Sequence, residues 1–372
     1  FRQMFSQVTN PPMDSLREHR VMSLRTRLGN LGNVLTENPG QCNLLQLESP
    51  VLLTSEFAAM REYMGVTASE VDCTFDPWES TEPLPAALER ICMEAEDAVR
   101  GGCTHLIITD EGMNAERAAI PMILATGAVN GHLVKQSLRT FTSLNVRSAE
   151  CLDVHYFAVL IGVGATTVNA YLTEDAINER HAAGLFAGQP LDECLANYKF
   201  AIGKGLLKIM SKMGIGVVSS YRGGCNFEAV GLSRSLVARY FPDMVSRISG
   251  IGLQGILQKV ADMHDTAYGG EATALPVGGF YRYRANGERH GHNGELIHIL
   301  QTAVNTESYS TYKRYAEGIY AAAPIFLRDL VDFNPDGPPI SVDEVESITT
   351  IRRRLVSPAI SLGALGPEAH ET

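Results

Sequence analysis

The sequence lacks an excess of positive charge, a long apolar run and a signal peptide. Its 372 residues carry 42 Asp and Glu against 31 Lys and Arg, a net charge of −11, so it lacks the cationic excess of a nucleic-acid binder. No apolar run approaches the roughly 18 residues of a membrane span. The N-terminal FRQMFSQ lacks the basic and then apolar order of a signal peptide. These absences predict a soluble cytoplasmic protein with no nucleic-acid or membrane partner.

Cysteine is also sparse and irregularly placed. The seven cysteines stand at positions 42, 73, 92, 103, 151, 194 and 225, and no two lie closer than 11 residues. An odd count at these spacings fits neither a disulfide framework nor a CxxC metal knuckle, so we expect reduced thiols in a core. The chain begins with Phe1 rather than Met and ends at Thr372 in a helical pattern. We therefore expect a piece of a longer polypeptide.

From Leu44 to Ala165, short apolar runs alternate with helical patterns. Crossovers of about 30 residues that contain a helix indicate parallel strands, because a hairpin needs only a few residues. Strands are predicted at 44–53, 71–75, 105–109 and within 142–146, and helices after Pro83, from about Pro121 to Val134, and from Val154 to Ala165. The fold class is therefore α/β. Periodicity alone leaves an α/β barrel and a doubly wound sheet open.

The pattern changes towards the C-terminus. We predict a long helix at about 195–213 and a strand at 215–219 that ends in Tyr221-Arg222-Gly223-Gly224. The sequence becomes polar and turn-rich near residue 282, a helix is predicted at about 295–317, and Asn334 to Pro339 is typical of a stiff linker. A strand at 355–362 and a helix from Gly366 predict the opening of another βα domain.

Three motifs suggest chemistry without establishing it. LIGVGATTVNAY places Thr167 where a dinucleotide fingerprint needs Gly or Ala, so close helix packing by small residues is the favoured interpretation. His290, His292 and Glu295 have the composition of a metal triad but lie in a polar turn, which favours a solvated loop. Asp110 and Glu111 follow a predicted strand, where they would act as a base, as metal ligands or as a helix cap; they stay unassigned.

The segment 194–227 is unusual in an acidic protein. It holds four lysines and one arginine but no Asp or Glu, a local charge of +5. On a helical wheel, Lys204, Lys208 and Lys212 cluster opposite the apolar stripe, so the helix is amphipathic with a cationic outer face. Such a face usually meets only water. The alternative is docking against an acidic surface of a neighbouring domain or subunit.

Six stretches together resemble one family. They are FSQVTNPPMDSLRE (5–18), LESPVL (47–52), GLLKIMSKMGIGVVSSYRGG (205–224), FEAVGLS (227–233), GGFYRYR (278–284) and SLGALGPEAHET (361–372). In this order they resemble the glutamate synthase family, in its large subunit. The resemblance implies an incomplete TIM-barrel-like central domain at 1–285, a helical and linker segment at 286–340, and the beginning of an FMN-type βα barrel at 341–372.

The resemblance also implies a role. In this family an amidotransferase domain releases ammonia from glutamine, and a tunnel carries it to an FMN domain that makes glutamate from 2-oxoglutarate. The central domain braces the two sites, forms part of the tunnel wall and carries no catalytic residue. By the resemblance, this part holds no metal or cofactor, while the parent enzyme holds FMN and a 3Fe-4S cluster. The implied partners are the amidotransferase and FMN domains and an NADPH-dependent small subunit; a ferredoxin-dependent parent stays open.

Residue by residue, the resemblance points to two places. Thr9 and Asn10 fall in the stretch that approaches the tunnel entrance, although Asn-Pro-Pro is also an ordinary turn. Ser361, Leu362, Gly363 and Ala364 match the first barrel strand and turn beside the FMN and 2-oxoglutarate site. Ile360 and Gly366 depart from the Met and Ser usual there.

Two other functions stay open from the sequence. One is a free-standing FMN-dependent α/β-barrel oxidoreductase, in which Tyr221-Arg222-Gly223-Gly224 follows a strand and receives a phosphate. The other is an interaction module that docks through the cationic helix.

Overall fold

The computed structural model describes residues 1–4, 13–14, 16–79, 83–270, 277–280, 282–291, 293–356 and 360. Two compact units divide the chain, at 1–273 and 274–372. The domain limits predicted at 285 and 340 stay a prediction. None of the helices in the described ranges combines the length and apolar character needed to cross a membrane.

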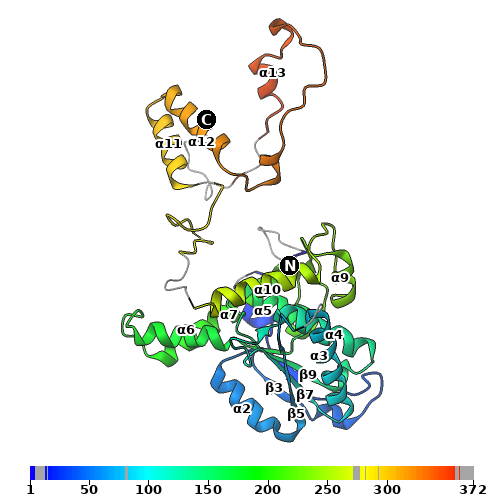
Figure 1. Ribbon diagram of the computed structural model, residues 1–372. Helices are drawn as coiled ribbons and strands as arrows, with labels where there is room; N and C mark the ends of the chain where they lie inside the picture. The colour runs from blue at the N-terminus through cyan, green and yellow to red at the C-terminus, as the bar shows by residue number, and fades with distance from the viewer. Residues whose placement is uncertain are drawn as a thin grey trace. The chain divides into compact units, whose positions relative to one another are not determined.

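Unit 1 is built on a five-stranded parallel sheet (Figure 1). Its strands are β4 (Val51–Leu52), β5 (Ala68–Asp72), β7 (His105–Thr109), β9 (Ser143–Arg147) and β10 (Thr167–Asn169). They lie side by side in the order β4, β10, β9, β7, β5. The first two strands along the chain are therefore the two edges, which is the order of a barrel opened between β4 and β5. This confirms the predicted α/β class and the incomplete barrel.

Three helices form the crossovers of this sheet. They are α3 (Pro83–Arg100), α4 (Met122–Lys135) and α5 (Val154–Gly162). The buried stripe of α3, including Leu84, Leu88 and Ile91, packs in one core with the strand residues Leu106 and Ile108. The helix ends at Gly101 and Gly102, and Gly102 has the positive φ of +98° that glycine tolerates. The apolar stripe and both ends of α3 were correctly predicted. Helix α5, predicted to run to Ala165, ends at Gly162.

The opposite face of the sheet packs against a different layer. Helix α2 (Thr54–Met64) and strand β2 (Thr26–Leu28), which pairs antiparallel with β3 (Leu45–Leu47), supply it. Phe57, Met60 and Met64 join Leu28, Leu52 and Ile107 in this second core. Ile107 alternates with Leu106 and Ile108 along β7, so it points to the other side of the sheet.

Several predicted elements differ from the structure. The strand 44–53 is two strands, because β3 pairs with β2 while β4 joins the parallel sheet. The strand 71–75 also divides, since β5 ends at Asp72 and β6 (Thr74–Phe75) pairs antiparallel with β8 (Ala118–Ala119).

The prediction of a strand at 215–219 is wrong. Val217 makes a single bridge to Ser23, and α8 (Val218–Tyr221) follows at once, because no neighbouring strand continues the pairing. Strand β10 and helix α6 (Tyr171–Ala182) were not predicted. Only three residues of β10 pair, which is too short for a periodic signal.

Six further α-helices and strands belong to unit 1. They are β1 (Arg2–Gln3), α1 (Glu18–Val21), α7 (Leu191–Met213), β11 (Phe227–Glu228), α9 (Arg234–Tyr240) and α10 (Leu253–Tyr268). Helix α7 was predicted from residue 195 and packs on α5 and α6. Strands β1 and β11 pair antiparallel.

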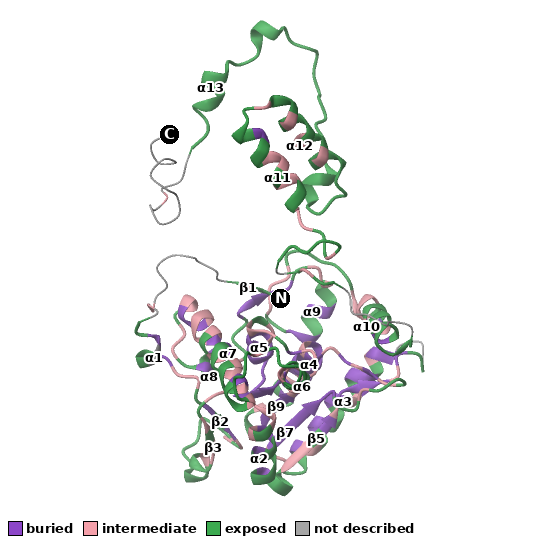
Figure 2. Ribbon diagram, turned by 90° about the vertical axis from the view of Figure 1, so that its left-hand side faces the viewer, coloured by how far each residue is buried: buried purple, intermediate pink, exposed green. Residues whose placement is uncertain are grey.

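Unit 2 contains a packed pair of helices, α11 (Gly294–Asn305) and α12 (Tyr309–Ala321), and the short α13 (Ile348–Arg352). The prediction of a single helix at 295–317 is therefore wrong, because two helices occupy this range. Glu307 adopts a positive φ of +49° between the two helices, and the Ser308 side chain caps α12 by accepting a hydrogen bond from the backbone N–H of Thr311. Figure 2 shows that most described residues of this unit are exposed. The second βα barrel was predicted at 341–372. Residues 341–356 of this range hold a short 3-10 helix at Val342–Glu344 and α13, whereas most of the strand predicted at 355–362 and the helix predicted from Gly366 fall outside the described residues.

Candidate functional site

A row of polar side chains lies at the carboxyl end of the parallel sheet. The strand register aligns Asp72 with Thr109, Thr109 with Arg147, and Arg147 with Asn169, so the four share one face. In α/β folds, ligands bind outside the carboxyl ends of parallel strands. We call these four residues the carboxyl-edge row.

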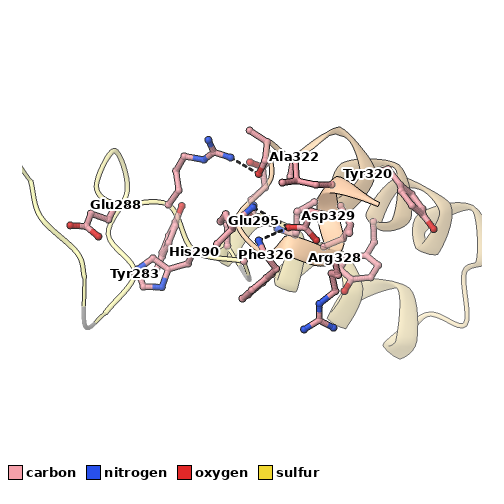
Figure 3. Close-up of a pocket in the computed structure, with 18 of the residues that line it drawn as sticks. Tyr283, Glu288, His290, Glu295, Tyr320, Ala322, Phe326, Arg328 and Asp329 are labelled. Carbon is pink, nitrogen blue, oxygen red and sulfur yellow. Dashed lines mark hydrogen bonds between the residues drawn. The ribbon is translucent and has the colours of Figure 1, made fainter. Parts of the chain in front are cut away.

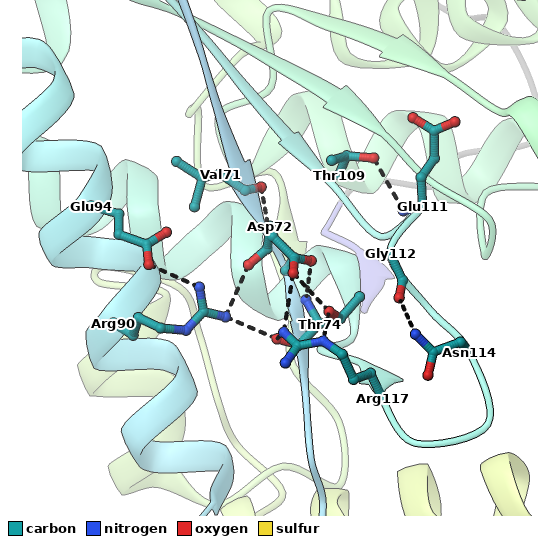
Figure 4. A network of polar contacts seen from close by, with 11 residues as sticks. Val71, Asp72, Thr74, Arg90, Glu94, Thr109, Glu111, Gly112, Asn114 and Arg117 are labelled. Atoms are coloured by element: carbon teal, nitrogen blue, oxygen red, sulfur yellow. Dashed lines mark hydrogen bonds and ion pairs between the residues drawn. The ribbon is translucent and has the colours of Figure 1, made fainter.

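Asp72 is bound to groups of its own chain (Figure 4). Its Oδ2 accepts a hydrogen bond from the Thr74 hydroxyl at 2.9 Å and pairs with Nη2 of Arg117 at 3.1 Å. Arg90 donates from Nη2 to the carbonyl oxygens of residues 72 and 74, each at 2.9 Å. Gly112 lies close by, since a Cβ there would stand 3.2 Å from Oδ1 of Asp72. A cavity of about 340 Å³ next to this network has Arg90, Arg117 and acids among its lining residues.

Arg147 is held on three sides. Its Nη2 lies 2.7 Å from Oε1 of Glu111, and its guanidinium lies 5.3 Å from the ring centroid of Phe57 and 5.2 Å from that of Tyr171. Stacking between two rings stabilises a partly desolvated guanidinium. Its Nε is buried without a hydrogen-bond partner among the described residues. Arg147 therefore joins β9 to α2, α6 and the loop after β7.

Asp110 follows β7 and is fully buried. Its two carboxylate oxygens accept from the backbone N–H of Ala149 at 3.0 and 2.9 Å, and Oδ1 accepts from the Tyr171 hydroxyl at 3.0 Å. Burial raises the pKa of Asp110 to about 6, and the charge of Glu150 also raises it. Asp110 thus links the end of β7 by hydrogen bonds to Ala149, after β9, and to Tyr171, after β10. Glu111 forms the ion pair with Arg147.

Asn169, at the other end of the carboxyl-edge row, is also hydrogen-bonded within the chain. Glu174 accepts hydrogen bonds from the backbone N–H of Thr54 at 2.9 and 3.0 Å and from Nδ2 of Asn169 at 2.9 Å. Burial raises the pKa of the Glu174 carboxyl. Except for Nε of Arg147 and Oδ1 of Asn169, which have no hydrogen-bond partner among the described residues, the polar groups named at this edge take part in hydrogen bonds or ion pairs within the chain.

The three predicted docking lysines lie along α7. Lys208 pairs with Oε1 of Glu18 at 3.1 Å, Lys204 is exposed and Lys212 is half-buried. Nearby on the same helix, Lys199 pairs with Glu56 at 2.5 Å. Two of the five cations of segment 194–227 are thus neutralised by acids from distant parts of the chain. The docking role stays a prediction.

The structure also places the other sequence motifs. A Cβ at Gly162 would lie 2.4 Å from the Phe227 ring, and one at Gly164 would lie 2.3 Å from Asn130, which confirms close packing. His290 bonds to the carbonyl oxygen of Gly279 at 2.6 Å. His292 is outside the described residues, and those residues contain no group of three side chains able to hold a metal. Also outside the described residues are Thr9, Asn10, Ser361, Leu362, Gly363 and Ala364.

A pocket of about 1100 Å³ in unit 2 was not predicted (Figure 3). Tyr283, His290, Glu295, Tyr320 and Phe326 are among its lining residues. Two of its charged residues bond to nearby backbone: Arg289 donates to the carbonyl oxygen of residue 323 at 2.6 Å, and Asp329 accepts from two N–H groups. The polar segment that begins near residue 282 was the available signal.

Comparisons with known proteins agree on one family. Residues 1–233 match the family model "Glutamate synthase central domain", and residues 290–372 match "Conserved region in glutamate synthase". The large chain of glutamate synthase [NADPH] from Azospirillum brasilense is 65% identical over 372 residues, which are 100% of this chain and 25% of that protein. The corresponding large chain from Bacillus subtilis is 36% identical, over 100% of this chain and 24% of that protein.

A relative of another type is the ferredoxin-dependent glutamate synthase 2 of Synechocystis. It is 36% identical over 395 aligned residues, which cover 100% of this chain and 25% of that protein. This chain therefore spans about a quarter of the length of the curated relatives it matches. Because a family model covers residues 1–233, the chain belongs to the glutamate synthase central domain family.

Proposed function

We propose that this chain is the central part of a cytoplasmic glutamate synthase large chain, where it braces the amidotransferase and FMN domains and forms part of the ammonia tunnel wall. It contributes shape and confinement rather than reactive groups. The parent converts glutamine, 2-oxoglutarate, two electrons and two protons into two glutamates. The electrons come from NADPH through a small subunit or from ferredoxin.

One observation carries the non-catalytic role. The polar groups at the carboxyl edge of the sheet, where a barrel enzyme holds its substrate, are engaged within the chain: Asp72 by Arg117, Arg147 by Glu111, and Asn169 by Glu174. A general base or nucleophile must reach its substrate. These contacts favour a structural role for the edge.

Confinement matches the chemistry of the parent. Ammonia released from glutamine attacks the carbonyl of 2-oxoglutarate, water leaves, and the iminoglutarate takes up two electrons and two protons to become glutamate. In bulk water near neutral pH, ammonia is mostly ammonium, which has no free electron pair. A shielded path preserves the nucleophile. On the resemblance, Thr9 and Asn10 line this path.

The motif that suggested a phosphate site for FMN does not follow a strand of the parallel sheet. Tyr221 is the last residue of the short helix α8, and Arg222, Gly223 and Gly224 come directly after it. This removes the cue for a free-standing flavin oxidoreductase. We place FMN and the 3Fe-4S cluster in other parts of the parent.

The test uses the full large chain with its electron donor. We expect Thr9→Trp to lower glutamine-dependent glutamate formation at least about tenfold, because a bulky side chain obstructs the path. Ammonia-dependent glutamate formation and glutamine hydrolysis should change less than about twofold. Thr36→Trp, in an exposed loop, is the matched control. Equal loss of the glutamine-dependent and ammonia-dependent reactions would contradict the tunnel role.

A second measurement tests the absence of reactive groups. This chain alone, incubated with glutamine, 2-oxoglutarate and dithionite, should yield no glutamate. In the full large chain, Asp110→Asn should leave the kcat of the folded enzyme within about twofold, whereas loss of a general base costs about 10²-fold or more. Turnover by the isolated chain would overturn the proposal.

A further inference from the structure

The cavity of about 340 Å³ next to the Asp72 network is open on one face of α3. Pro83, Ala86, Ala87 and Arg90 line it, and their spacing places them on a single side of this helix. The two alanines in the middle of this face have short side chains, which leaves room for a ligand. In α/β folds, ligands bind at this end of the parallel strands.

Two arginines from distant segments meet at this cavity, as Figure 4 shows. Arg90 and Arg117 each donate from Nη2 to the carbonyl oxygen of Thr74 at 2.9 Å. Because they share this acceptor, the two Nη2 atoms are at most 5.8 Å apart. Ion pairs of Arg90 with Glu94 and of Arg117 with Asp72 hold the two side chains in place. The cavity therefore has two fixed guanidinium groups in its wall.

Both guanidinium groups keep N–H donors for a ligand. Arg117 uses Nε and Nη2 for its contacts with Thr74 and Asp72, while Arg90 uses Nη1 and Nη2. A guanidinium has five N–H groups, and in the part of the chain that the structure describes no hydrogen bond involves Nη1 of Arg117 or Nε of Arg90. The side chains are 36% and 42% exposed, for Arg90 and Arg117 respectively, so solvent reaches them.

Two acids line the same cavity. They are Asp76 and Glu79, and within the described ranges no ion pair includes either of them. Oδ1 of Asp76 accepts a hydrogen bond from the backbone N–H of Trp78 at 2.8 Å, which orients this carboxylate. The lining therefore carries two positive and two negative side chains.

We propose that this cavity binds a free α-amino acid, with its carboxylate on Arg90 and Arg117 and its ammonium group on Asp76 and Glu79. The planar guanidinium matches the two oxygens of a carboxylate, and an ammonium group offers three donors to acids. A simple anion would be repelled by the two acids, and a simple cation by the two arginines. The volume lies near the lower end of the range for small-molecule pockets, about 300–1,000 Å³.

Thermal unfolding of this chain tests the site, with L-alanine as the probe. At about 20 mM, L-alanine should raise the unfolding midpoint by about 2–4 °C. N-acetyl-L-alanine, which has no ammonium group, and L-alaninamide, which has no carboxylate, should each give less than about a quarter of this shift at equal ionic strength. The absence of a shift with L-alanine, or equal shifts with all three compounds, would overturn the proposal.

Substitution of the acids separates the zwitterion from a simple anion. Asp76→Asn with Glu79→Gln leaves the arginine contacts intact, so the L-alanine shift should be lost while the shift with N-acetyl-L-alanine should increase. Glu62→Gln, at an exposed position of α2, is the matched control and should keep the wild-type response. An equal L-alanine shift in wild type and the double variant would contradict the role of the acids.

The arginines need a readout that does not depend on stability, because Arg117→Gln also removes the contacts with Asp72 and Thr74. Equilibrium dialysis with radiolabelled L-alanine supplies it. We expect about one equivalent bound per wild-type chain and at least about tenfold weaker binding by folded Arg117→Gln and by the double variant. The absence of saturable binding by the wild-type chain would overturn the proposal.

Discussion

The Nζ of Lys208 lies 3.1 Å from Oε1 of Glu18, across 190 residues of sequence. Glu18 is only 6% exposed, and it also accepts a hydrogen bond from the Ser211 hydroxyl at 3.2 Å. A lysine on the cationic face of α7 thus binds a buried acid of α1. The lysines of this face are therefore not equivalent.

We expect Lys208→Glu to lower the free energy of unfolding by about 1–3 kcal/mol, because it places a carboxylate beside a buried carboxylate. Lys204→Glu, at an exposed position on the same helix, should change it by less than about 0.5 kcal/mol. Urea unfolding of this chain measures both. Equal effects of the two substitutions would show that the Glu18 contact adds nothing.

The docking role predicted for Lys204, Lys208 and Lys212 is best tested on Lys204 and Lys212, because Lys208 pairs with Glu18. If α7 faces an acidic surface in the parent, Lys204→Glu with Lys212→Glu should weaken association of the large chain with its partners at least about tenfold, and more at low salt. Analytical ultracentrifugation at two salt concentrations checks this. Unchanged assembly at both would mean that the face meets only water.

The buried carboxyl of Asp110 should make stability depend on pH. Its pKa is raised from 3.8 to about 6, so the folded chain holds this proton more tightly than the unfolded chain does. Its contribution to the free energy of unfolding is therefore present below about pH 4 and is lost as the pH rises to about 6.

Asp110→Asn does not titrate, so its free energy of unfolding relative to wild type should increase by about 1–3 kcal/mol between pH 4 and pH 7. Urea unfolding at each pH measures this difference. Asp265→Asn, on an exposed part of α10, is the control. A difference that stays constant across this range for Asp110→Asn would argue against the raised pKa.

Two helical glycines should respond oppositely to alanine. A Cβ at Gly162 would lie 2.4 Å from the fully buried Phe227, whereas a Cβ at Gly203 of α7 has ordinary contact with Leu24 at 3.4 Å. Gly162→Ala should lower the free energy of unfolding by about 1–3 kcal/mol, because the added methyl group overpacks the core. Gly203→Ala should raise the free energy of unfolding by about 0.5–1 kcal/mol, because alanine is the better helix former. Thermal unfolding compares them, and a stable Gly162→Ala would contradict the close packing.

The sequence by itself determined the elements with strong local signals. Strand β7 was predicted to the residue because the short apolar run HLIIT follows the helix-ending Gly101 and Gly102. In the structure all five of its side chains are buried. Helix α3 was predicted from its apolar spacing and from Gly101 and Gly102. The family resemblance was also recognised from the sequence alone, because it depends on the identity of the residues and not on their contacts.

The tertiary structure alone decided how these elements meet. Only folding places β4 beside β10, gives Asp110 the N–H of Ala149, and brings Glu18 to Lys208. It also made 218–221 a helix, because a strand needs a neighbour to pair with. Each of these contacts joins segments far apart along the chain, and local periodicity carries no information about which distant partner a residue will find.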